Sequence, residues 1–131
     1  MGDAESYATA AIRISAGATD VSQIAALIPL TPTRKTERAK SSAAESRWIY
    51  ESDLPSSSIE DHVEGLLSLI EANRSSFKAL PTDCEIDIWC TISSQREFVG
   101  FYLSRGLLKR AASLDVEFVF SVYRGSESDV H

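Results

Sequence analysis

The stretch from Cys84 to Ser93 alternates between two kinds of side chain at every position. One set is apolar and consists of Cys84, Ile86, Ile88, Cys90 and Ile92; the other consists of Glu85, Asp87, Trp89, Thr91 and Ser93. Because successive side chains of a strand point to opposite faces, this alternation predicts a half-buried strand. Its second face combines two carboxylates with a tryptophan, an unusual composition for a face that meets only solvent.

The length and composition fit one globular domain. The chain has 131 residues, of which 44% are hydrophobic, enough for a real core. We expect a single domain over residues 1–131, with flexible ends at residues 1–6 and 125–131. The longest uncharged stretch, residues 21–33, is short and interrupted by prolines, so no membrane-spanning helix is expected. The N-terminus lacks the apolar run of a secretory signal.

The two cysteines, Cys84 and Cys90, lie on the same face of the predicted strand. At about 3.4 Å per residue their Cα atoms are roughly 20 Å apart, whereas a disulfide requires about 7 Å or less. We interpret both as small core residues, which fits a reducing compartment, and we expect a cytoplasmic protein.

Further strands and helices surround this strand. Strands are predicted at residues 7–15, 33–37, 47–52, 98–103 and 116–123, and helices at residues 20–28, 58–77 and 104–114, with a mobile loop at 38–46 and a turn at 94–97. The order is β-α-β-β-α-β-β-α-β. It predicts an α+β fold with a largely antiparallel sheet of five to six strands, ferredoxin-like in part. If the helices all pack on one face, the other face is open or meets a partner.

Charge is unevenly distributed along the chain. Residues 34–47 carry five basic side chains against two glutamates, for a net charge of +3 within a total of −6. The remaining residues therefore form an acidic body with a net charge of −9. This balance argues against nucleic-acid binding.

The polar face of the alternating strand is the first candidate site. Glu85, Asp87 and Trp89 are expected to share it with Trp48 and Tyr50 of the strand at residues 47–52. Exposed aromatic side chains among charges are typical of a protein-binding surface. The alternative is that Trp89 packs under the long loop and that the carboxylates are simply solvated.

The basic residues before and within the loop are the second candidate site. Arg34, Lys35, Arg38 and Lys40 are suited to binding an anion or an acidic protein patch. The alternative is a solvated loop whose cations pair with the acidic body of the same chain.

No catalytic, metal or cofactor motif is recognisable. Glu85 and Asp87 stand side by side on one strand face and are suited to acid–base work, but no third group at a fixed spacing accompanies them. His62 lies near the start of the second helix and is interpreted as a helix-boundary residue, with a general base as the alternative. We assign no catalytic residues, no metal ligands and no cofactor.

An ordered set of short motifs resembles the bacterial domain-of-unknown-function family 4279. The motifs are Pro32-Thr33-Arg34, Trp48 to Ser52 followed by Leu54-Pro55, Ile59 and His62 followed by Leu66-Leu67, and Gly100 to Leu103 followed by Leu107-Leu108. The resemblance covers residues 6 to 124. It implies no activity, although small bacterial proteins of this kind are found as immunity partners of secreted toxins.

The leading hypothesis is a cytoplasmic protein that works by binding another protein. Its concrete form is an immunity protein whose acidic surface neutralises a basic toxin domain. The alternatives are a small-ligand or anion-binding module around Arg34, and an enzyme of unknown type. We expect no nucleic-acid or membrane partner, and a homodimer remains open.

Overall fold

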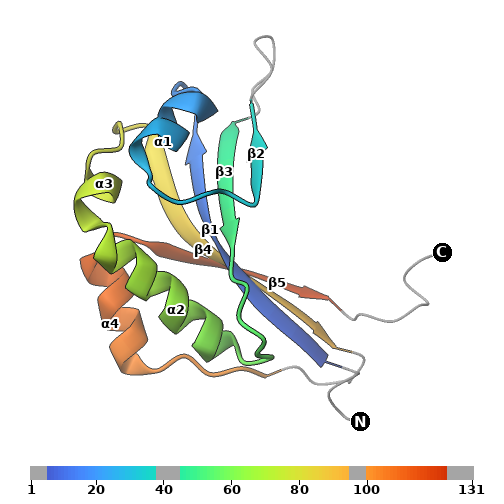
Figure 1. Cartoon of the computed structure of the whole chain (residues 1–131). Helices are drawn as coiled ribbons and strands as arrows, with labels where there is room; N and C mark the ends of the chain where they lie inside the picture. Colours follow the sequence, from blue (N-terminus) through green and yellow to red (C-terminus); the bar gives the residue numbers. More distant parts are fainter. Residues whose placement is uncertain (1–5, 38–44, 95–99, 124–131) are drawn as a thin grey trace, which may run out of the picture.

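The computed structural model describes residues 6–37, 45–94 and 100–123, and Figure 1 shows their arrangement. The strands are β1 (Ser6–Ala16), β2 (Arg34–Thr36), β3 (Ser46–Glu51), β4 (Cys84–Ser94) and β5 (Glu117–Tyr123). The helices are α1 (Val21–Leu27), α2 (Ile59–Ala72), α3 (Arg74–Lys78) and α4 (Arg105–Ser113). The strands form one sheet, and the helices all lie on one side of it.

The sheet order is β2-β3-β1-β4-β5. Strand β1 pairs antiparallel with both β3 and β4, and β2 pairs antiparallel with β3. Strand β5 instead runs parallel to β4, and α4 lies in the connection between them. The prediction of an α+β fold with a largely antiparallel sheet and helices on one face is confirmed.

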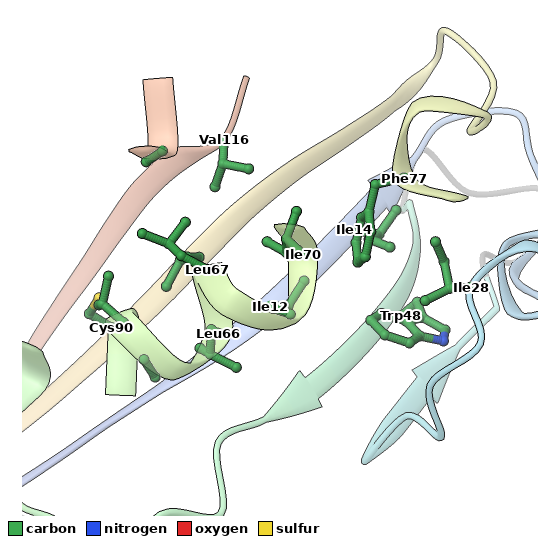
Figure 2. Close-up of a cluster of buried hydrophobic side chains, with 14 of the residues drawn as sticks. Ile12, Ile14, Ile28, Trp48, Leu66, Leu67, Ile70, Phe77, Cys90 and Val116 are labelled. Atoms are coloured by element: carbon green, nitrogen blue, oxygen red, sulfur yellow. The ribbon is translucent and has the colours of Figure 1, made fainter. Parts of the chain in front are cut away.

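The core lies between the sheet and α2. Ile12 and Ile14 of β1 are completely buried, and Leu66 and Ile70 of α2 pack onto the same cluster (Figure 2). Each fully buried aliphatic side chain contributes about 1.5–3 kcal/mol to folding.

Both cysteines are free, as expected. Cys90 is completely buried. Its burial, and to a smaller extent the negative charge of Asp87, raises the pKa of its thiol to about 12. Burial likewise raises the pKa of Cys84, which is half-buried. These environments keep both groups as thiols and fit their interpretation as core residues.

The predicted helix starts are confirmed by their capping contacts. The Gln23 side chain accepts the backbone N–H of Asp20 at 3.0 Å. Ser58 accepts the N–H of Asp61 at the start of α2, and Ser104 accepts the N–H of Leu107 at the start of α4. Each cap satisfies a backbone donor that has no partner inside its helix.

Two predicted elements differ from the structure. The helix expected at residues 58–77 is divided, since α2 ends at Ala72 and α3 begins after Asn73. The strand expected at residues 98–103 is wrong for Gly100 to Leu103, which are not in a strand, while residues 98 and 99 lie outside the described residues. This segment instead belongs to the crossover to β5, and Phe101 stacks on Phe120 at a centroid distance of 4.9 Å.

Other predictions fall partly or wholly on residues that the structure does not describe. These are residues 1–5 and 125–131 of the expected flexible ends, most of the loop at 38–46, and residues 95–97 of the turn. Ser6, expected in a flexible end, belongs to β1, and Ser94, expected in the turn, belongs to β4. Ser46, expected in the loop, already belongs to β3.

Candidate functional site

The sheet face opposite the helices is the candidate site. We call it the open face; it consists of the odd-numbered residues of β1, β3, β4 and β5 together with Arg34 and Thr36 of β2. The even-numbered residues of β1, β3 and β4 supply the buried cluster under the helices. None of the four described helices lies over the open face in Figure 1.

An ion pair occupies the middle of the open face. Arg13 donates from Nε to Asp87 Oδ1 at 3.1 Å and from Nη2 to Asp87 Oδ2 at 3.0 Å. Both side chains are only 15% exposed, although they lie on the face away from the described helices. A two-pronged arginine–carboxylate contact of this kind is strong and directional.

Trp89 is fixed beside this pair. The Arg13 guanidinium lies 5.0 Å from the centre of the Trp89 ring, which allows a cation–π attraction. The indole Nε1–H donates to the Ser121 hydroxyl of β5 at 2.9 Å. Three strands therefore hold one side chain, and Trp89 presents its remaining surface in a defined orientation.

The two ends of the open face differ in character. At one end Tyr7 and Tyr123 flank Ser93 in register, and they are 59% and 53% exposed. At the other end Glu85 and Glu117 are exposed and form no ion pair within the part of the chain that the structure describes. The face thus runs from an aromatic end, through Trp89 and its ion pair, to an acidic end.

Of the five residues expected to share one sheet face, three do so. Glu85, Asp87 and Trp89 lie on the open face, with Asp87 paired to Arg13. Trp48 and Tyr50 do not join them, because the pairing of β3 with β1 sets Trp48 beside Ile14 on the helix side. Trp48 is completely buried there, near Ile28 in Figure 2, so the expectation of a shared face is wrong for both.

The basic cluster does not converge in its described part. Arg34 lies on the open face and pairs with Glu51 at 3.1 Å, whereas Lys35 points to the opposite side of β2. Arg38 and Lys40 lie outside the described residues. Of the four cations, the structure thus describes Arg34, which is paired, and Lys35, which lies on the other side of β2.

His62 is buried on the helix side, away from Glu85 and Asp87. Its Nε2 lies 2.6 Å from the carbonyl of Ser56, which can only accept, so this nitrogen carries the proton. Its Nδ1 lies within hydrogen-bond distance of the Ser52 hydroxyl, at 2.6 Å, and a hydroxyl can donate or accept there. His62 thus ties α2 to the segment before it as a helix-boundary residue, but its partners are Ser52 and Ser56 and not the neighbouring carboxylate that such a residue was expected to have.

A pocket of about 580 Å³ at the sheet edge was not foreseen. The apolar part of its lining includes Ile70, Phe77, Leu80, Ile86 and Leu114. The charged residues of its lining are Arg74 and Lys78 of α3, together with Glu85, Asp115 and Glu117. In the sequence, only the spacing of Arg74 and Lys78 could have pointed to this pocket, because its other lining residues come from distant segments.

Within residues 6–37, 45–94 and 100–123, no three histidine, cysteine or carboxylate side chains gather as a metal site would require. None of the described helices combines the length and apolar character needed to cross a membrane.

Comparison with known proteins places the chain in a family. Residues 5–125 match the profile of the family described as a domain of unknown function (DUF4279). The chain belongs to this family, as its ordered motifs indicated. No curated protein and no solved structure matches it.

Proposed function

We propose that this protein is a protein-binding module that recognises its partner through the open face. The observation that carries the proposal is a sheet face that no described helix covers, on which Arg13, Asp87 and Trp89 hold one another in place. In its concrete form the protein is an immunity protein that binds and neutralises a basic toxin domain.

The composition of the open face supports a protein as the partner. Tyr7, Trp89 and Tyr123 are aromatic residues of the kind that dominate binding energy in protein interfaces. Short hydroxyl side chains, Thr91 and Ser121 among them, lie between the aromatic residues in register. A broad face of this composition suits another folded protein better than a small molecule, which requires a concave site.

The charge of the face supports a basic partner. Glu85 and Glu117 offer two exposed carboxylates at one end, within a chain of net charge −6. Complementary charge accelerates encounter and fixes the orientation of the two proteins. Action in the cytoplasm is part of the proposal, since both cysteines are free thiols and suit a reducing compartment.

The test is protection of bacteria that express a basic toxin domain encoded beside this protein. Wild type should protect, and Glu117→Lys or Trp89→Ala should weaken protection and binding. Asp53→Lys is the matched control, because Asp53 is exposed and lies outside the open face. The proposal is wrong if wild type does not bind the toxin, or if the open-face variants act like the control.

The pocket supports a second candidate function, small-ligand binding. Its volume of about 580 Å³ falls in the range of roughly 300–1,000 Å³ typical of ligand sites. Its lining combines two cations of α3 and three carboxylates with apolar side chains. This arrangement suits a zwitterion with an apolar body, such as an apolar amino acid.

Thermal shift with apolar amino acids would test this candidate, because a bound ligand raises the melting temperature. Lys78→Glu should abolish the shift, and the corresponding amines, which lack the carboxylate, should give a smaller one. An unchanged melting temperature with every amino acid would remove this candidate.

A further inference from the structure

Among the described strands, β5 lies at one end of the sheet and its outer edge has no partner. It pairs with β4 alone among the described residues, and it extends over seven residues, Glu117–Tyr123. The opposite edge is β2, which is only three residues long and carries Arg34 and Lys35. Short length and positive charge are the usual protection of a sheet edge against further pairing.

Strand β5 lacks this protection. After Glu117 it contains no charged residue and no proline. Phe120 is 40% exposed and Val122 is 54% exposed. Phe118 stacks on Phe120 at 6.1 Å, and Phe101 extends the aromatic row at 4.9 Å. A free backbone edge with an apolar row beside it is a template for another strand.

We propose that β5 pairs antiparallel with β5 of a second copy of this chain, so that two sheets join into one. The pattern of β5 is self-complementary about Phe120. A twofold axis there sets Phe118 opposite Val122 of the second copy, and Val119 opposite Ser121 of the second copy. The apolar rows of the two chains then lie side by side on one sheet face and contact each other.

The same register keeps Glu117, the only charged residue of β5, away from its copy in the second chain. Glu117 lies opposite Tyr123 of the second copy, and the two copies of Glu117 stand at opposite ends of the paired strands. No like charges oppose each other across the junction, which would destabilise it. The two open faces come to lie side by side on one sheet, whether or not they bind a partner protein.

Molecular mass in solution tests the proposal. Sedimentation or light scattering of the purified chain should give twice 14.3 kDa. Phe120→Lys and Val122→Lys should each halve that mass and keep the circular dichroism of the fold. Leu27→Lys is the matched control, since Leu27 is 37% exposed on α1, and it should stay dimeric. A monomeric wild type, or dimeric lysine variants on β5, would overturn the proposal.

Oxidative cross-linking tests the register separately. Phe120→Cys should form a covalent dimer, because residues facing each other across the twofold axis lie within the roughly 7 Å that a disulfide spans. Tyr7→Cys, on an exposed position outside β5, should not cross-link at a comparable rate. Equal rates for the two variants, or no cross-link at Phe120→Cys, would refute this pairing.

Discussion

The ion pair on the open face should stabilise the fold more than an equally short pair at the sheet periphery. Arg13–Asp87 and Arg34–Glu51 have nitrogen–oxygen distances of 3.0 and 3.1 Å. They differ in exposure: both side chains of the first pair are 15% exposed, whereas those of the second are 55% and 45% exposed. The two pairs therefore separate the effect of burial from that of distance.

The expected magnitudes follow from this difference. At 3.0 Å the gross attraction is about 1.4 kcal/mol at the dielectric constant of water and about 5.5 kcal/mol at an effective value of about 20. For Arg13–Asp87 we expect a coupling energy of about 2 kcal/mol, within the range for hydrogen bonds to charged groups. For Arg34–Glu51 we expect about 0.5 kcal/mol or less, as measured for exposed pairs.

A double-mutant cycle for each pair measures these couplings. Arg13→Ala, Asp87→Ala and the double variant are unfolded in urea and followed by circular dichroism, and the Arg34–Glu51 cycle is run alongside. In Arg13→Ala the fluorescence of Trp89 should also change, since the cation over its ring is lost. The reasoning fails if the Arg13–Asp87 coupling is no larger than the Arg34–Glu51 coupling.

Three further predictions concern stability. Asp83 accepts hydrogen bonds from the Thr19 hydroxyl and from the N–H groups of Thr19 and Ala18, and these bonds lower its pKa to about 2. The resulting stabilisation is complete above about pH 4 and should be lost as the pH falls toward 2. It should be absent in Asp83→Asn. Trp48 Nε1 is buried without a partner among the described residues. Trp48→Phe should therefore lower the free energy of unfolding by much less than the roughly 4 kcal/mol expected for Trp48→Ala. Gly65→Ala should stabilise α2 by about 0.5–1 kcal/mol, because the added Cβ meets only the exposed, movable Leu54 side chain at 3.2 Å.

Each of these has a direct control. For Asp83, melting temperatures of wild type and Asp83→Asn are compared between pH 2 and 7, and parallel curves would contradict the assignment. For Trp48, urea unfolding that gives equal losses for phenylalanine and alanine would show that the indole N–H carries a needed contact. For Gly65, the Gly65→Ala substitution is repeated in a Leu54→Ala background, where it should give the full gain in the free energy of unfolding. A loss of stability in that background would contradict the argument.

The alternating strand could be predicted from the sequence because its signal is local. Every second residue from Cys84 to Ile92 is apolar, and no distant partner is needed to decide which face is buried. The caps at Ser58 and Ser104 are equally local, since each hydroxyl bonds to a backbone group three residues away.

The orientation of β3 could not be predicted in the same way. Both of its faces carry large apolar side chains, with Trp48 and Tyr50 on one and Ile49 on the other. Only the pairing with β1 decides the matter, because it aligns Trp48 with Ile14 of the core. The two tryptophans of the chain therefore lie on opposite faces of the sheet.

The contacts that organise the open face were also beyond the sequence pattern. Arg13 and Asp87 are separated by 74 positions, and their contact depends on the register of β1 with β4. The aromatic segment at Gly100 to Leu103 has high strand propensity but forms no strand, because β5 takes the free edge of β4.

The close fit of Arg13 between Asp87 and Trp89 affects what binding costs. A free surface arginine or tryptophan must lose side-chain entropy when a partner immobilises it, at roughly 0.5–1.5 kcal/mol for each side chain. On this face both side chains are already held in one conformation by their neighbours in the unbound protein. A partner that docks on Trp89 meets a preorganised anchor, so more of each new contact is retained as affinity, and the complex dissociates more slowly.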